Sequence, residues 1–211
     1  CHTTYRDGTP IPQVTDNDEW FNLTTGAWCY IDNNPSNGVL YNWYAVAGIY
    51  NEASSTNISL RKEFSPEGWH VPSSSEWTIL EDYLVANDYN CLDDLINGEL
   101  NTLAKSMAST SGWDTTLGTL YEGYSCAVGT NQSTNNSSEF NILPSGFRGN
   151  SFTTAPFNAE QAFFWSSTPS EFGGHALSRV IAWYIDDFRT GENYSWSGMN
   201  VRLVKDSNVG S

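Results

Sequence analysis

The histidines and cysteines of this chain do not fall into a recognisable catalytic or zinc-binding pattern. They are His2, His70, His175, Cys1, Cys29, Cys91 and Cys126. The spacing contains no CxxC pair and no HExxH, and the chain has neither a GxSxG elbow nor a phosphate-binding Walker loop. We therefore expect no catalytic residues, no zinc and no enzymatic activity. One disulfide is possible, but spacing alone does not assign its partners.

Three polar features could still do chemistry. His70 stands between Trp69 and Val71 just before an expected helix, which favours a buried, hydrogen-bonded structural role. The pair Asp93-Asp94 is typical of an exposed helix face, whereas Asp186-Asp187 lies among aromatic residues and could bind a cation or a polar ligand. Alternatively, both acidic pairs are exposed to solvent and bind nothing. No acidic cluster has the spacing of a known calcium loop, so we expect no cofactor and leave a structural calcium ion open.

The last fifty residues mix large aromatic side chains with short polar ones. Such a mixture offers rigid contact area together with adaptable hydrogen bonds, which is the chemistry of a binding surface. The predicted ligand-binding residues are His175, Ser178, Trp183, Tyr184, Asp186, Asp187, Arg189, Asn193, Tyr194 and Trp196. Alternatively these aromatics belong to the core and the polar residues to turns. For Trp165 the core is the better assignment, while Trp183, Tyr184, Tyr194 and Trp196 fit either role.

The elements that must position these residues form a mixed pattern. Asp16 can cap a short helix to Leu23, and Ser73 with Glu76 forms a capping box before a longer one. Further expected elements are a second core helix over Leu92–Met107, a strand or core segment over Val39–Tyr50, and strands over Phe163–Ser167, Val180–Phe188 and Met199–Lys205. Helices followed by strands predict one α+β domain, residues 1–211, with two core helices, an antiparallel sheet and long loops.

Composition restricts the partners and the location. The chain has 211 residues, 9 Lys plus Arg, 24 Asp plus Glu and a formal charge of −15, which argues against binding nucleic acid or an anionic membrane. No apolar run reaches the length of a membrane span. The low Lys content and Asn-rich polar character favour an extracellular, cell-surface or virion protein. Cys1 would suit the lipidated residue of a lipoprotein, and the oligomeric state stays undetermined.

Several strings, in order along the chain, resemble one family. They are LYNWYAV at 40–46, PEGWHVPSSSEWTIL at 66–80, LPSGFRGN at 143–150, FWSST at 164–168 and VRLVKD at 201–206. Together they are similar to the Fibrobacter succinogenes major paralogous domain. The resemblance implies a C-type-lectin-like fold of the variety shared with formylglycine-generating enzymes, with a core helix after GWHVP and a ligand-facing surface on the C-terminal strands.

The resemblance also indicates what does not transfer. Family members usually carry cysteines where this chain has Ser65 and Leu203, so we expect a family disulfide to be missing, which weakens any extracellular inference from that bridge. A formylglycine-generating enzyme needs two late reactive cysteines, and no cysteine follows Cys126. The EPN, QPD and WND motifs of calcium-dependent lectins are absent as well.

Variable proteins of diversity-generating retroelements often use this lectin-like fold and vary in their C-terminal strands. Residues 175–200 occupy that place within an expected ligand-binding, variable region at 163–206. By this analogy the first hypothesis is a non-enzymatic binding protein that recognises a protein or glycan and is diversified by a retroelement. The alternative is a fixed adhesin or lectin-like lipoprotein module of a bacterial envelope.

Overall fold

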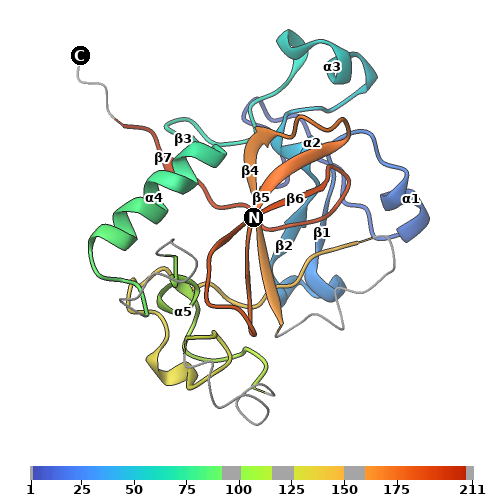
Figure 1. Ribbon diagram of the computed structural model, residues 1–211. Helices are drawn as coiled ribbons and strands as arrows, with labels where there is room; N and C mark the ends of the chain where they lie inside the picture. The colour runs from blue at the N-terminus through green and yellow to red at the C-terminus, as the bar shows by residue number, and fades with distance from the viewer. Residues whose placement is uncertain (1, 92–100, 116–125, 150–159, 208–211) are drawn as a thin grey trace.

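The computed structural model describes residues 2–91, 101–115, 126–149 and 160–207 of the chain, an α+β arrangement built on small antiparallel sheets. The largest sheet has the order β4-β5-β6, from Gln161–Pro169, His175–Ala182 and Arg189–Tyr194. Two-stranded sheets pair β1 (Trp28–Tyr30) with β2 (Val39–Tyr41) and β3 (Trp69–His70) with β7 (Val204–Lys205). The helices are α1 (Asn17–Phe21), α2 (Trp43–Val46), α3 (Glu52–Thr56), α4 (Ser74–Ala86) and α5 (Ala104–Met107), joined by long loops (Figure 1).

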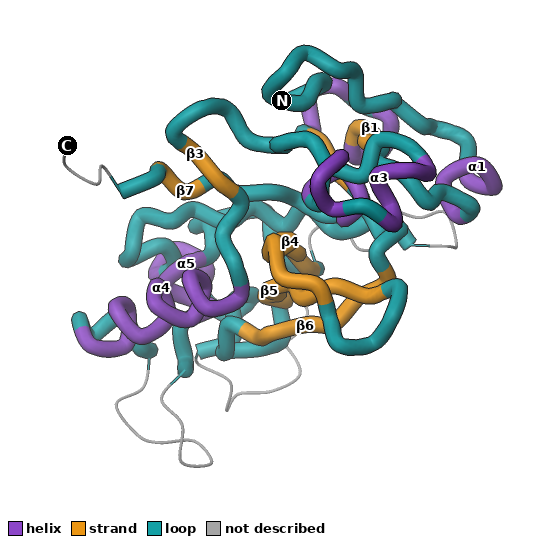
Figure 2. The backbone as a smooth tube through the Cα atoms, turned by 90° about the horizontal axis from the view of Figure 1, so that it is seen from above, coloured by secondary structure: helices purple, strands orange, loops and turns teal. Residues whose placement is uncertain are grey.

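Strands β4 and β5 of the central sheet are covered on both faces, whereas β6 is largely exposed. Figure 2 shows α4 and α5 on one side of β4 and β5, and β1, α1 and α3 on the other. Phe164 packs with Trp77 of α4, whereas its neighbour Trp165 points to the opposite face and packs with Trp43 and Met199. Successive strand residues alternate between faces, so two covered faces explain why the run Phe163–Trp165 is apolar without alternation. The core assignment of Trp165 is confirmed.

Two indole hydrogen bonds join this sheet to the N-terminal half of the chain. Trp165 Nε1 donates to the carbonyl of Tyr41 at 2.9 Å, and Trp43 Nε1 donates to the carbonyl of Ser166 at 3.0 Å. A buried tryptophan needs a partner for its N–H group, and each indole here finds a main-chain acceptor more than 120 residues away. The two halves of the chain are therefore parts of one packed unit.

Helix α4 begins as the capping box predicts. The Ser73 hydroxyl accepts from the Glu76 amide, and the Glu76 carboxylate accepts from the Ser73 amide at 2.8 Å. These bonds satisfy donors that the first turn would otherwise leave unpaired. Trp77 and Leu84 are the buried side chains of the helix, and they place its apolar face on the central sheet.

An ion pair attaches α4 to β5. Arg179 is buried, and its guanidinium bonds the Glu81 carboxylate at 3.0 Å and the Thr78 hydroxyl at 2.8 Å. The middle of β5 is thus attached to α4.

Several expected elements are corrected. The strand predicted over Val180–Phe188 ends at Ala182, and the next six residues form the turn to β6. The strand predicted over Met199–Lys205 is regular only at β7, with isolated bridges at Met199 and Asn200. Val39–Tyr50 holds β2 and α2, which the prediction of one strand or core segment did not separate.

The second core helix, predicted over Leu92–Met107, is helical only at α5 within the described chain. Residues 92–100, which include Asp93-Asp94, lie outside the described residues, as does Cys1. The short helix capped by Asp16 is confirmed, since the Asp16 carboxylate accepts from the Glu19 amide at 2.9 Å. None of the helices in the described part of the chain has the length and apolarity to span a lipid bilayer.

Arg148 joins the beginning of the chain to its end. Its buried guanidinium donates to the carbonyls of Val14, Thr15 and Asp16 at 2.7–3.0 Å and to Asn17 Oδ1 at 3.0 Å. The same group lies 4.2 Å from the centre of the Trp20 ring. The Arg148 main chain exchanges two hydrogen bonds with Gly198. One side chain therefore supplies the donor for the buried Val14 carbonyl and adds donors to the Thr15 and Asp16 carbonyls just before α1.

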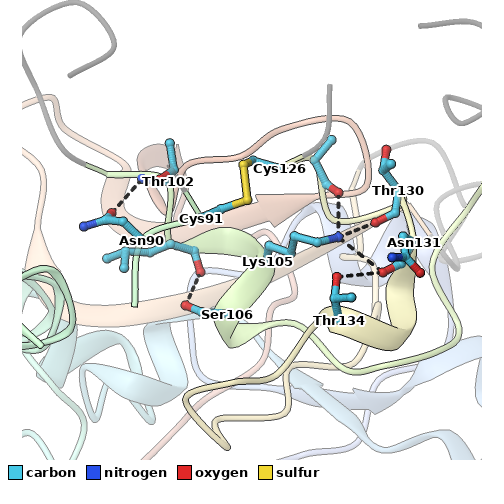
Figure 3. Close-up of a disulfide and its surroundings, with 11 residues drawn as sticks. Asn90, Cys91, Thr102, Lys105, Ser106, Cys126, Thr130, Asn131 and Thr134 are labelled. Carbon is cyan, nitrogen blue, oxygen red and sulfur yellow. Dashed lines mark hydrogen bonds between the residues drawn. A yellow bond between two sulfur atoms is a disulfide. The ribbon is translucent and has the colours of Figure 1, made fainter. Parts of the chain in front are cut away.

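A disulfide and a buried lysine fix the loop around α5 (Figure 3). Cys91 and Cys126 are bonded across 35 residues of sequence, which assigns the disulfide that spacing left open. A loop of this length contributes about 4 kcal/mol in the chain-entropy account. Beside it, the Lys105 ammonium donates to the carbonyls of Ala127, Thr130 and Asn131, and burial lowers the pKa of Lys105. Cys29 is a buried free thiol.

Replacing Arg148 with Leu should destabilise the protein strongly. The change leaves the buried Val14 carbonyl without a donor, which costs about 1–3 kcal/mol, and it also removes the charge-assisted bonds to the Thr15 and Asp16 carbonyls and to Asn17 Oδ1. We therefore expect the free energy of unfolding to fall by at least about 3 kcal/mol. Urea denaturation followed by tryptophan fluorescence measures it. The exposed Arg189→Leu is the matched control and should cost about 1 kcal/mol or less. Equal losses in the two variants would contradict the role of Arg148.

Candidate functional site

The ten predicted ligand-binding residues lie on one hairpin, but they do not form one site. β5 and β6 pair in antiparallel register from His175 opposite Tyr194 to Val180 opposite Arg189. Since β5 has eight residues, its two ends are about 23 Å apart. His175, Tyr194 and Trp196 lie at one end, and the residues between Trp183 and Arg189 lie at the other. The prediction of a single surface over residues 175–196 is therefore corrected to two separate clusters.

At the first end, four rings from two distant segments form a continuous column. His175 and Tyr194 have ring centres 4.3 Å apart, and Tyr194 stacks on Trp196 at 5.3 Å with planes 14° apart. Trp196 in turn meets Phe21 of α1 edge to face at 5.0 Å. We call these four residues the aromatic column. Phe21 was not predicted from the sequence, because nothing near it indicates a contact with the C-terminal hairpin.

The backbone places this column without help from the ring chemistry. The register opposes His175 to Tyr194, and the Ser195 amide donates to the Gly174 carbonyl at 2.8 Å. Gly174 has φ +77°, a left-handed conformation that glycine adopts easily. Ser195 also accepts from the Trp43 amide at 2.8 Å. Residues 194 and 196 consequently project side by side while the residue between them is anchored to α2.

The column is open to solvent and edged by carboxylates. Tyr194 is 53% exposed and Phe21 is 46% exposed, while His175 and Trp196 are half-buried. Asp18 and Glu19 are exposed on the same helix as Phe21, and Glu192 is exposed two residues before Tyr194 on β6. Because side chains two apart on a strand share a face, Glu192 and Tyr194 point to the same side.

The two predicted residues in the middle of the hairpin, Ser178 and Asn193, contact each other inside the sheet. Ser178 is only 1% exposed, so its predicted place at the edge of the site is wrong in this structure. Its hydroxyl accepts from Asn193 Nδ2 at 2.8 Å. A Cβ at Gly191 would lie 2.7 Å from the same hydroxyl oxygen, so the sheet is tight here. The partly buried Asn193 side chain serves this internal bond.

At the second end, the turn is held through its main chain. Gly129 donates to the Trp183 carbonyl at 2.7 Å, Val128 to the Ile185 carbonyl at 3.2 Å, and Ala104 to the Asp186 carbonyl at 3.0 Å. Trp183 is half-buried and packs against the core, whereas Tyr184 is 44% exposed.

The acidic pair in this turn is used differently from the prediction. Both oxygens of Asp187 accept from Arg189 Nε, at 2.7 and 2.6 Å. Hydrogen bonding to Asp187 raises the pKa of Arg189. Within the described ranges, no group of three or more His, Cys, Asp or Glu side chains is arranged to hold a metal ion.

His70 has the predicted hydrogen-bonded role, although it is partly exposed and not buried. Its Nδ1 lies 2.6 Å from Asp206 Oδ1 and its Nε2 lies 2.7 Å from Glu76 Oε1. With a carboxylate at each ring nitrogen, the imidazolium form is favoured, and the bond to Asp206 followed by that to Glu76 raises the pKa of His70. A general base needs a free ring nitrogen. His70 instead ties the C-terminal segment to the start of α4.

Three hollows in the described chain lie away from the ten predicted residues. One, about 660 Å³, is lined by Asn200 and Arg202. Another, about 610 Å³, lies along α4 beside Leu203 and also includes Arg202, and a third, about 360 Å³, lies near Arg6. The sequence prediction concentrated on aromatic density and so did not find them.

Comparison with known proteins gives one result. Residues 1–205 match the sequence profile of the Fibrobacter succinogenes major domain. The chain belongs to this family. Searches of curated proteins and of solved structures gave no match. The strings that carried the resemblance have structural roles in this Fibrobacter succinogenes major domain. Trp69 and His70 form β3, Ser73 caps α4, and Trp77 packs α4 on the core. Phe164 and Trp165 pack on opposite faces of β4.

The His70 contacts predict a pH-dependent stability. A raised pKa means that the native state binds this proton more tightly than the unfolded chain, whose histidine pKa is about 6.5. The contribution is therefore complete below that pH and is lost as pH rises through the native pKa. We expect the stability difference between wild type and His70→Gln, measured by urea denaturation from about pH 5 to about pH 9, to shrink with rising pH.

His2→Gln is the matched control for this measurement. Partial burial lowers the pKa of His2, so its pH-dependent contribution is lost as pH falls and the difference should change in the opposite direction. A His70→Gln difference that is flat, or that grows as pH rises, would refute the assignment.

Proposed function

We propose that this chain is a non-enzymatic binding protein whose recognition surface is the aromatic column at the end of the β5–β6 hairpin. The observation that carries the proposal is the stack of four rings, two of them about half exposed, held by main-chain bonds. Tyr and Trp are the side chains that dominate binding energy at interfaces. Rings already locked against one another lose little conformational entropy when a partner covers them.

The charge around the column favours one class of partner. Asp18 and Glu19 are exposed on the helix that carries Phe21, Glu192 is exposed two residues before Tyr194, and the whole chain carries −15. A protein surface that presents Arg or Lys would gain both long-range attraction and cation–π contact with Tyr194 or Trp196. We therefore infer a protein partner with basic groups, and a glycan is the competing ligand class. The setting would be extracellular, on a cell surface or on a virion.

The finer fold and the origin of the surface belong to the same proposal. We infer the C-type-lectin-like fold of the formylglycine-generating variety, with residues 163–206 as the variable region of a retroelement-diversified protein within a single domain, residues 1–211. Support comes from the way the hairpin is held. Positions 183, 185 and 195 are fixed through carbonyl and amide groups, which every substitution except proline retains. The exposed side chains beside these positions, such as Tyr184 and Tyr194, can change without loss of the backbone path.

Truncating the column should abolish recognition. Purified wild-type protein is screened on arrays of surface proteins and of glycans, and the dissociation constant of each hit is measured for Tyr194→Ala and Trp196→Ala. Truncating a central anchor residue should cost about 2 kcal/mol of binding free energy, which corresponds to roughly 30-fold weaker binding. Tyr83→Ala is the control, because Tyr83 is 60% exposed on α4 away from the column. Unchanged affinity in the column variants, or equal loss in the control, would exclude this surface.

Diversification has a separate test. Deep sequencing of the gene from its source population should find substitutions concentrated in codons 175–200, with 163–168 and 201–206 nearly constant. Codons 163–168 and 201–206 should change little, because Phe164 and Trp165 pack in the core on the two faces of β4 and Asp206 bonds to His70. Sparse variation spread evenly along the gene would instead support the fixed envelope adhesin, with the aromatic column retained as its binding surface.

A further inference from the structure

One hollow of the described chain is lined by polar groups from three segments. It measures about 660 Å³, within the usual range for small-molecule sites. Three segments meet there, from the loop before β2, the loop at 141–145 and the run at 200–202 that precedes β7. Its polar lining residues are Ser36, Asn37, Asn141, Ser145, Asn200 and Arg202. We call this space the Arg202 hollow.

The polar groups suit a ligand rich in hydroxyls. An asparagine amide offers both donors and an acceptor, and a serine hydroxyl does the same, so each can match a sugar hydroxyl in either direction. Leu143, Pro144 and Val201 add apolar surface to the wall, which can cover the C–H faces of a sugar ring. A few polar groups on an apolar wall are typical of small-molecule sites.

The charge of the hollow is opposite to that of the chain. The chain has 24 acidic residues against 9 basic ones, yet the lining contains one arginine and no carboxylate. Asp32 accepts a hydrogen bond from Asn37 Nδ2 at 3.4 Å, but it does not line the hollow. An anion that enters therefore meets a guanidinium with no acid among the lining groups.

Arg202 is prepared for such an anion. Its guanidinium lies 5.1 Å from the Phe140 ring centre and 5.9 Å from that of Phe164, and its only hydrogen bond within the described chain is to the Phe140 carbonyl at 3.4 Å. By contrast, Arg179 and Arg189 are both paired with carboxylates. Arg202 is exposed and lines both this hollow and the one along α4. The two rings lie beside its planar guanidinium, whose donors match a carboxylate.

We propose that the Arg202 hollow binds a sugar unit that carries a carboxylate, such as a uronic acid. The Arg202 guanidinium receives the carboxylate, and the side chains of Asn37 and Asn141 bind the ring hydroxyls. Asn200 adds only its Oδ1 as an acceptor, because its Nδ2 donates to the Ser145 hydroxyl and the Phe163 carbonyl. This site is separate from the aromatic column, and it does not depend on the function proposed for that surface.

The experiment measures binding of galacturonate, galactose and acetate to the full chain by calorimetry and by ligand-observed NMR. Galacturonate should bind saturably with a dissociation constant in the millimolar range or tighter, and galactose and acetate each more weakly. Arg202→Gln should weaken galacturonate at least about tenfold, because it removes a charge-assisted bond. Lys205→Gln loses the same charge from exposed β7 outside the hollow and should change affinity less than about twofold.

A second variant covers the case in which Arg202→Gln fails to fold. Asn141→Asp places a carboxylate in the hollow at an exposed position with φ +56°, a conformation that Asp tolerates, and it should also weaken galacturonate at least about tenfold. Tyr194→Ala should leave this binding unchanged. The proposal is overturned if galacturonate does not bind, if galactose binds equally well, or if the Arg202 and Lys205 variants lose affinity equally.

Discussion

The hydrogen bonds of the Arg148 guanidinium are the interaction on which most of the remaining structure depends. Long loops leave many main-chain carbonyls inside the protein, and buried carbonyls without donors are costly. Arg148 supplies the donor for the buried Val14 carbonyl and adds bonds to the Thr15 and Asp16 carbonyls before α1. The Lys105 ammonium donates to three carbonyls of the loop at 127–131. Both cations have carbonyls where a carboxylate would be expected. Two of only nine basic residues are thus used to donate hydrogen bonds to main-chain carbonyls. These bonds replace the main-chain hydrogen bonds that longer β-strands would provide.

This framework explains why one hairpin can be both rigid and chemically open. Arg179 fixes β5 to α4 on one face, and Trp165 fills the other. Beyond that core, the turn at 183–188 and the segment around Ser195 are held by main-chain bonds. Tyr184 and Tyr194, which are exposed at the two ends, consequently contribute little to folding, whereas Ile185 and Phe188 are buried. The aromatic column at one end and the Asp187–Arg189 pair at the other are therefore available for contacts outside the molecule.

Local signals predicted the elements that local chemistry determines. The capping boxes and caps at Asp16 and Ser73 placed α1 and α4 correctly, since these bonds lie within three residues. The aromatic run after Ala182 predicted a strand, but donors from residues 104, 128 and 129 hold it as a turn. Such donors are invisible to a pattern along the sequence. Phe21 and the Arg202 hollow were missed for the same reason, because each depends on segments that meet only in the folded chain.

The bonds that close the molecule connect residues far apart in sequence. Arg148 reaches Val14 across 134 residues, His70 reaches Asp206 across 136, and the two indole bonds span 123 and 124. Such a topology is expected to fold slowly, because the entropy of closing long loops is lost before any of these bonds can form. Both core faces also stay open until β4 has been synthesised. During translation the aromatic side chains of the N-terminal half therefore stay uncovered until the C-terminal segments that pack against them have been synthesised.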